Sequence, residues 1–180
     1  IQWFDLTAIT PSAARFNPEK LLWVNQQHIQ ALPIQTLCDQ ISSLLGEMNY
    51  SHPPLPHVLA LLKERDRTLV DLANSAKMFY APLAITAEDE AKHLTPDALA
   101  AVQLFGDKLA VLPAWIAEDI SAALKAVLAE TGLKMPKVAI PVRLMLFGTT
   151  QTPSIDAMLS TLGSELTLQR LDAALQRYCG

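Results

Sequence analysis

Two clusters of basic residues are the part of this 180-residue sequence whose residue types and spacing best suit chemistry, and that chemistry is the binding of anions or base edges. In the first cluster, Lys63, Arg65 and Arg67 alternate with two acids at the predicted end of a helix. On a helix, Lys63 and Arg67 would share one face while Arg65 points elsewhere. Ion pairing on the protein surface also explains this cluster, so both interpretations stay open.

The second cluster lies in a segment, 131–155, that contains no acidic residue. It consists of Lys134, Lys137 and Arg143, and the small polar loop 148–153 (GTTQTP) follows it and leads into a predicted helix. Backbone N–H groups and hydroxyls in such a loop suit phosphates or base edges. Because Arg143 precedes Thr152 by only nine residues, we expect its side chain to stand beside this loop.

Motifs of the common enzyme classes are missing from the sequence. There is no glycine-rich phosphate loop, no G-x-S-x-G elbow and no H-E-x-x-H zinc motif. His52 and His57 lie in a proline-rich loop at a spacing that is poor for a shared metal, and Asp89 and Glu90 belong to a charged, solvated segment. We therefore expect no catalytic residue and no metal site in this chain.

Composition predicts an all-α protein. Half of the residues are hydrophobic and 18% are charged, which excludes a disordered chain, and glycine is scarce at 6 residues. No apolar run approaches the roughly 18 residues of a membrane-spanning helix. Cys38 and Cys179 form no C-x-x-C pair and are interpreted as reduced thiols. These features predict a soluble, cytoplasmic protein, and the start at Ile1 instead of Met suggests a piece of a longer polypeptide.

Capping signals and apolar spacing predict where the helices lie. Asn17-Pro18 and Thr95-Pro96 are typical helix starts, and Thr131-Gly132 is a typical end. Thr152-Pro153 and Ser164-Glu165 are predicted to start the last two helices. Apolar spacing predicts further helices over 34–45, 58–62, 69–80, 116–131 and 135–147, the last with Pro141 inside it. A seam near residue 80 divides two predicted subdomains, 1–80 and 81–180, and Trp3, Trp23 and Trp115 are predicted to pack in the core or at the hinge.

Several segments resemble one family. Residues 16–25 (FNPEKLLWVN) resemble the F-D-x-E-K-L-x-W-x-N helix that follows the catalytic half of bacterial glutamyl-tRNA synthetases. Residues 64–69 (ERDRTL) are similar to the family's R-x-x-T-L segment, and residues 135–143 (MPKVAIPVR) to its K-V-x-x-P-L-R segment. Three further matches follow the family's order, at 108–118, at 148–155 and at 162–175. Phe147 stands where the family usually has a threonine.

The resemblance implies the C-terminal, anticodon-binding half of a class I aminoacyl-tRNA synthetase, built from two packed helical subdomains. Its implied partner is tRNA-Glu, and it is expected to be a monomer that contacts no membrane. ATP and magnesium would serve the catalytic half, whose H-I-G-H and K-M-S-K-S signatures do not occur in this sequence. A helical protein-interaction module remains the alternative, favoured by the acidic stretch 84–119 and the net charge of -4.

The resemblance also implies which residues read the anticodon. The arginine of the R-x-x-T-L segment is associated with the first anticodon base and corresponds to Arg65. The residues associated with the second and third bases correspond to Arg143, Thr152, Pro153 and Ile155. These residue types fit, because loop bases are splayed out, stacked and hydrogen-bonded at their edges, and a planar guanidinium does both.

Overall fold

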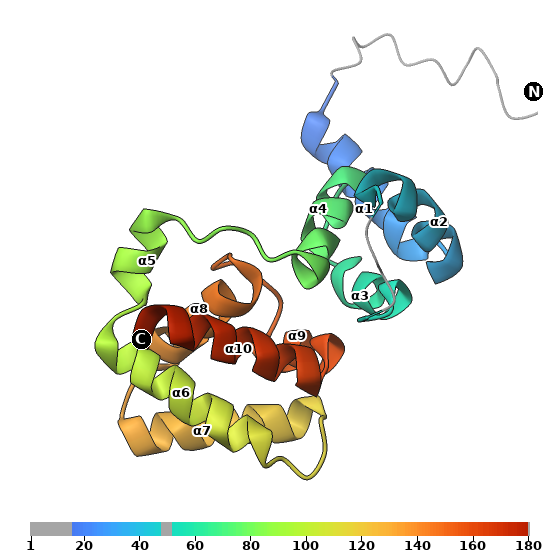
Figure 1. Ribbon diagram of the computed structural model, residues 1–180. Helices are drawn as coiled ribbons and strands as arrows, with labels where there is room; N and C mark the ends of the chain where they lie inside the picture. The colour runs from blue at the N-terminus through green and yellow to red at the C-terminus, as the bar shows by residue number, and fades with distance from the viewer. Residues whose placement is uncertain (1–15, 48–51, 180) are drawn as a thin grey trace, which may run out of the picture.

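A computed structural model describes residues 16–47 and 52–179, and it contains only helices in these ranges, which confirms the all-α prediction (Figure 1). Trp3 lies outside the described residues. None of the helices in the described part of the chain is long and apolar enough to cross a membrane. In chain order they are α1 (Pro18–Ala31), α2 (Ile34–Leu45), α3 (Leu55–Leu62), α4 (Leu69–Tyr80), α5 (Ala87–His93), α6 (Pro96–Ala110), α7 (Ala117–Thr131), α8 (Met135–Phe147), α9 (Ile155–Leu162) and α10 (Ser164–Cys179).

Local capping signals placed most helix ends correctly. The Asn17 side chain accepts a hydrogen bond from the Lys20 amide at 3.2 Å, so α1 begins where the sequence predicts. At its other end, α7 stops at Gly132, which adopts the left-handed conformation with φ of 67°. The start of α9 was predicted two residues too early, because the helix begins at Ile155 rather than at Thr152-Pro153.

The short helix α5 was not predicted. Thr86 caps it, since its hydroxyl accepts from the Asp89 amide at 3.1 Å and donates to the Asp89 carboxylate at 2.9 Å. No residue of α5 is buried. A helix without a buried face leaves no apolar periodicity in the sequence, so only this capping pattern could have revealed it.

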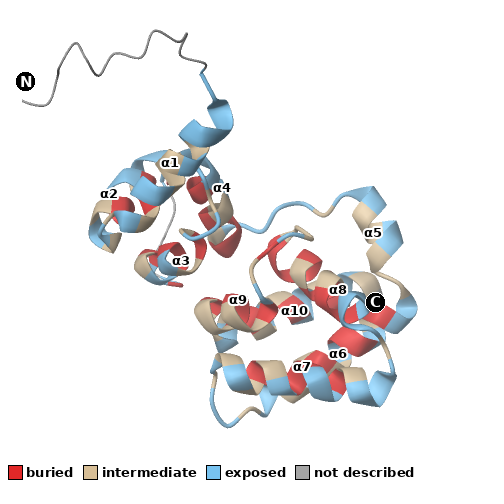
Figure 2. Ribbon diagram, turned by 180° about the vertical axis from the view of Figure 1, so that it is seen from behind, coloured by how far each residue is buried: buried red, intermediate tan, exposed pale blue. Residues whose placement is uncertain are grey.

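The helices gather into two sets. Helices α2, α3 and α4 pack against one another, while α6 to α10 form the second set, with α5 against α8. The extended segment 81–86 connects the sets, and α3 packs against α9 where they meet (Figure 1). The buried faces of both sets point inward (Figure 2), and their side chains form one contiguous apolar cluster. The division at residue 80 into two domains stays a prediction.

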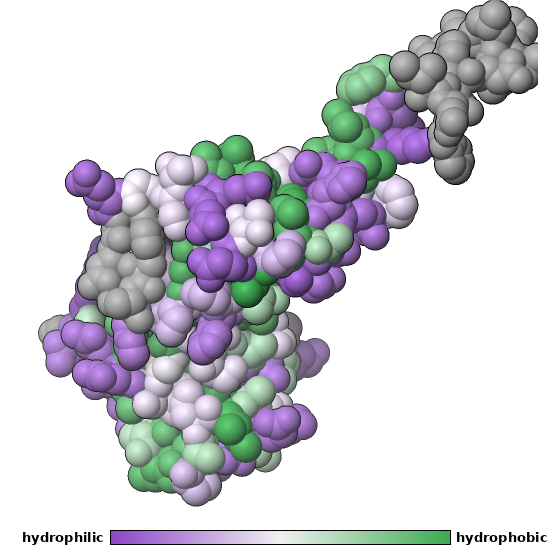
Figure 3. All heavy atoms as spheres, turned by 90° about the vertical axis from the view of Figure 1, so that its right-hand side faces the viewer, coloured by the Kyte–Doolittle hydropathy of each residue, from purple (hydrophilic) through white to green (hydrophobic). Residues whose placement is uncertain are grey.

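The tryptophans divide between core and surface. Trp115 packs against the core and donates its indole N–H to the Leu159 carbonyl at 2.8 Å, as predicted. The prediction is wrong for Trp23, whose side chain is 58% exposed. Only Ile29 of α1 is buried, so the first half of this helix carries apolar side chains that the core does not reach. Figure 3 shows apolar spheres at this start of α1.

Backbone approaches backbone where the connecting segment passes the end of α8. The Leu83 amide donates to the Phe147 carbonyl at 3.1 Å, and the Phe147 ring lies 5.4 Å from that of Phe79. Gly148 caps α8 with φ of 71°, and a Cβ added to it would lie 1.9 Å from the Leu83 carbonyl oxygen. Glycine is therefore required here both by the conformation and by the space.

We expect Gly148→Ala to destabilise the protein by more than Gly132→Ala. Both glycines cap a helix at nearly the same positive φ, but nothing lies within 4 Å of a Cβ added at Gly132. The positive φ costs each variant about 1–3 kcal/mol, and only Gly148→Ala adds the clash with Leu83. Urea unfolding of both variants and the parent measures the difference. Equal losses would show that Leu83 moves away without cost.

Candidate nucleic-acid interface

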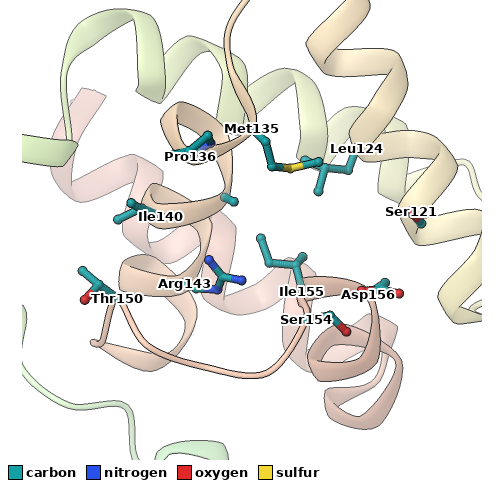
Figure 4. Close-up of a pocket in the computed structure, with 11 residues that line it drawn as sticks. Ser121, Leu124, Met135, Pro136, Ile140, Arg143, Thr150, Ser154, Ile155 and Asp156 are labelled. Carbon is teal, nitrogen blue, oxygen red and sulfur yellow. The ribbon is translucent and has the colours of Figure 1, made fainter.

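Arg143 projects from α8 into a pocket of about 370 Å³ between α7, α8 and the start of α9 (Figure 4). Apolar side chains make up most of the wall, and the loop before α9 closes one side. The residues that line it are Ser121, Leu124, Met135, Pro136, Ala139, Ile140, Arg143, Thr150, Ser154, Ile155 and Asp156. Of these, the sequence singled out Arg143, Ile155 and, as part of the loop 148–153, Thr150.

Arg143 is held by the loop that follows its helix. Its Nε donates to the Thr152 hydroxyl at 2.8 Å, and its Nη2 donates to the Pro153 carbonyl at 3.4 Å. The Thr152 hydroxyl in turn donates to the same carbonyl at 2.9 Å. The prediction that Arg143 stands beside this loop is confirmed. Thr152 is buried and its hydroxyl is engaged on both sides, so in this structure it orients the guanidinium.

Two effects lower the pKa of the Arg143 guanidinium, namely its burial and the charge of a second arginine. Burial lowers the pKa of the Arg143 guanidinium, and the like charge of Arg65 lowers this pKa further. The charge of Arg65, which belongs to the first set of helices, therefore acts on Arg143, which belongs to the second. In the described part of the chain the ion pairs are Arg67 with Glu19 and Lys108 with Glu130, and neither includes Arg65 or Arg143.

Arg65 lies in a loop, so the geometry predicted for a helix does not apply. Helix α3 ends at Leu62, and the chain turns before α4 begins at Leu69. The other two basic residues of the cluster bind α1: Lys63 Nζ donates to the Gln30 carbonyl at 3.1 Å, and Arg67 pairs with Glu19 at 3.0 Å. Arg65 is exposed. The cluster thus separates into two anchors and one outward-facing cation.

Amide side chains of α1 also fix this loop. Gln26 and Gln30 donate to the Glu64 carbonyl at 3.0 and 3.3 Å, and Asn25 donates to the Arg67 carbonyl. Nothing in the sequence indicates this role, although Asn25 is the last residue of the segment FNPEKLLWVN that carries the family resemblance. Helix α1 therefore supports the position of Arg65 from outside the pocket.

Asp66, next to Arg65, is partly buried, and only one of its two carboxylate oxygens has a hydrogen-bond partner. Its Oδ1 accepts from the Ser75 hydroxyl at 3.2 Å, while its Oδ2 is buried without a hydrogen-bond partner. Burial raises the pKa of the Asp66 carboxyl, the nearby Asp71 also raises it, and Ser75 and Arg65 oppose this rise without cancelling it. The ionised form is thus less stable in the folded protein than in the unfolded chain.

The two carboxylates considered as a catalytic pair make hydrogen bonds within the fold instead. Asp89 takes part in the cap of α5, and Glu90 accepts a hydrogen bond from the Tyr178 hydroxyl at 3.3 Å. Within 16–47 and 52–179, no group of three or more His, Cys, Asp or Glu side chains is arranged to hold a metal ion. Cys38 is a buried free thiol whose pKa is raised, chiefly by burial.

Comparison with known proteins matches this chain to one family. A family model described as "Anticodon binding domain" matches residues 28–175. A glutamate–tRNA ligase of Cupriavidus metallidurans is 46% identical over 180 residues, covering 97% of this chain and 38% of the relative. One of Chromobacterium violaceum is 42% identical over 174 residues, covering 95% and 38%. The chain thus spans well under half the length of these relatives.

A solved structure is similar over the same extent. It is that of a glutamate tRNA ligase from Elizabethkingia meningosepticum in complex with its amino acid, and the TM-score is 0.80 at 28% sequence identity. The match covers 96% of this chain and 35% of the solved chain. The likeness therefore extends over both sets of helices.

We expect the stability of the Asp66→Asn variant, relative to that of the parent, to increase as the pH rises. An asparagine keeps the acceptor for Ser75 but has no charge to bury. Between the ordinary carboxyl pKa of 3.8 and the raised pKa in the folded protein, the folded parent holds a proton that the unfolded chain has lost, so its stability falls as the pH rises through this range. Urea unfolding of both proteins at about pH 4 and about pH 7 tests this. A stability difference that is the same at both pH values would contradict it.

Proposed function

Because the chain belongs to the anticodon-binding domain family, we propose that it is the C-terminal part of a glutamate–tRNA ligase and grips the anticodon stem-loop of tRNA-Glu. The complete enzyme would attach glutamate to tRNA with ATP, and the ATP and magnesium sites would lie in the catalytic half outside this chain. The contribution of the present residues is positioning: they hold the tRNA so that its acceptor end meets the catalytic half. A cytoplasmic monomer is the expected state.

The observation that carries this proposal is the oriented guanidinium of Arg143 in an otherwise largely apolar pocket. A base splayed out of an RNA loop presents a flat apolar face and a polar edge. Met135 and Ile155 offer apolar surface for the face. The bonds to Thr152 and Pro153 do not use Nη1 of Arg143, which is left to pair with the edge.

Arg65 extends this site from the other set of helices. It is exposed, its loop is fastened to α1, and its charge acts on Arg143. The like charges of Arg65 and Arg143 act on each other, and neither arginine takes part in the ion pairs of the described residues, so together they favour a ligand that brings negative charge or acceptor atoms to both. An anticodon loop does so, because consecutive bases and their phosphates can reach both side chains.

A net charge of -4 is compatible with this role. Binding of RNA through its backbone in general requires many neutralised phosphates and a basic surface. Recognition of three loop bases requires only a few oriented side chains. The salt dependence separates this proposal from a protein-interaction module: binding of the stem-loop should weaken with added salt, whereas binding of a peptide in an apolar groove should change little.

We expect Arg143→Ala to weaken binding of the tRNA-Glu anticodon stem-loop by about 1–3 kcal/mol and to reduce the preference for the cognate second and third bases. Fluorescence anisotropy with the cognate stem-loop, and with one in which these two bases are exchanged, measures both effects. Arg177→Ala is the matched control, because it removes an exposed arginine that does not line this pocket. If Arg143→Ala bound both stem-loops as the parent does, the proposed site would be wrong.

Arg65→Ala should reduce discrimination at the first anticodon base and leave the preference at the third base largely intact. The reason is that Arg65 lies on a separate loop, while the Arg143 support from Thr152 and Pro153 is unaffected. The same anisotropy assay with stem-loops changed at the first base alone gives the result. An unchanged preference at that base would remove Arg65 from the site.

A further inference from the structure

Arg170 of α10 joins the two sets of helices through backbone carbonyls. Its Nη1 donates to the Met78 carbonyl at 3.2 Å and to the Leu146 carbonyl at 3.0 Å, and its Nη2 donates to the Phe79 carbonyl. Met78 and Phe79 belong to the last turn of α4, and Leu146 to the last turn of α8. One side chain thus binds the ends of two helices that lie in different sets.

The last carbonyls of a helix have no partner within the helix, and the helix dipole places partial negative charge there. A guanidinium satisfies both needs at both ends. Burial lowers the pKa of Arg170 to about 10, so the group still carries its charge at neutral pH. Removal of this side chain would leave three carbonyls at the junction without this donor.

Each of the two helices held by Arg170 leads to one of the proposed anticodon-reading arginines. Helix α4 begins at Leu69, directly after the loop that carries Arg65, and α8 carries Arg143 itself. We infer that Arg170 is a positioning residue for anticodon recognition: by fixing the end of α4 to the end of α8, it sets the separation of Arg65 and Arg143. This inference rests on the proposed function, since it assumes that both arginines bind one RNA loop.

The other contacts at the junction do not replace this link. The rings of Phe79 and Phe147 meet at a tilt of 58°, and α3 packs against α9, but apolar contacts have little directional preference. The bond from Leu83 to Phe147 starts from the connecting segment and not from α4 itself. Arg170 alone among these contacts makes directed polar bonds to the ends of both helices.

The first test needs no RNA. Spin labels at Gln35→Cys on α2 and Lys125→Cys on α7, both exposed positions, report the distance between the two sets in a background with Cys38→Ala and Cys179→Ala. We expect Arg170→Met, which keeps the length but not the donors, to broaden or shift the distance distribution. Arg170→Lys should give an intermediate result, and it serves as the second variant if Arg170→Met does not fold. Arg177→Met, on the same helix and exposed, should leave the distances unchanged.

The second test compares losses of RNA affinity in the full chain. Arg65→Ala in the parent should weaken stem-loop binding about tenfold. In the Arg170→Met background the same change should cost less than about threefold, because the two arginines no longer bind the loop at one fixed separation. A merely destabilised protein would not show this coupling. Val127→Ala, a buried change in α7 away from the junction, is the control for lost stability.

The outcomes separate this inference from the function on which it rests. Unchanged label distances in Arg170→Met and Arg170→Lys would overturn the inference whatever the RNA does. Changed distances with a full tenfold loss for Arg65→Ala in both backgrounds would overturn it as well, because the junction would then not govern the pair of arginines. A parent protein that binds no stem-loop would instead overturn the proposed function, and the positioning role with it.

Discussion

The ends of α4 and α8 present backbone carbonyls that their own helices cannot satisfy, and the guanidinium of Arg170 binds both. Close by, the Leu83 backbone occupies the space that any side chain at Gly148 would need. Together these contacts hold the ends of α4 and α8 and the connecting segment at one junction. The loop with Arg65 leads into one side of this junction and Arg143 lies on the other, so the geometry of the candidate site depends on residues that do not line its pocket.

Features set by neighbours in the chain were predictable from sequence. The cap at Asn17, the stop at Gly132 and the proximity of Arg143 to Thr152 all involve residues within one or two helical turns, or one short loop. Composition and apolar spacing suffice for the helical class in the same way. Helix α5 escaped because it buries nothing, and Trp23 was misplaced because hydrophobicity alone does not show which face of α1 reaches the core.

Features that depend on distant parts of the chain were not predictable from the residues alone. Nothing in the sequence near Arg170 indicates that its partners are the carbonyls of α4 and α8, because backbone groups leave no residue-specific signal. The same holds for Glu64, whose carbonyl accepts from two glutamines of α1. Only the family resemblance implied that Arg65 and Arg143 belong to one site. The structure adds that the charge of Arg65 acts on Arg143, which the separate motifs do not indicate.

An acidic protein in which Arg65 and Arg143 take no part in the ion pairs of the described residues suits selective rather than general binding of RNA. The net charge of -4 disfavours contact between the phosphate backbone and most of the surface, whereas Arg143 is partly desolvated and is repelled by Arg65. A ligand that brings acceptor atoms to both groups offsets this like-charge interaction, and Thr152 restricts how Arg143 meets the ligand. Under the proposed function, affinity therefore depends on the fit of a particular loop at one place, as expected where a protein must reject other RNAs of equal charge.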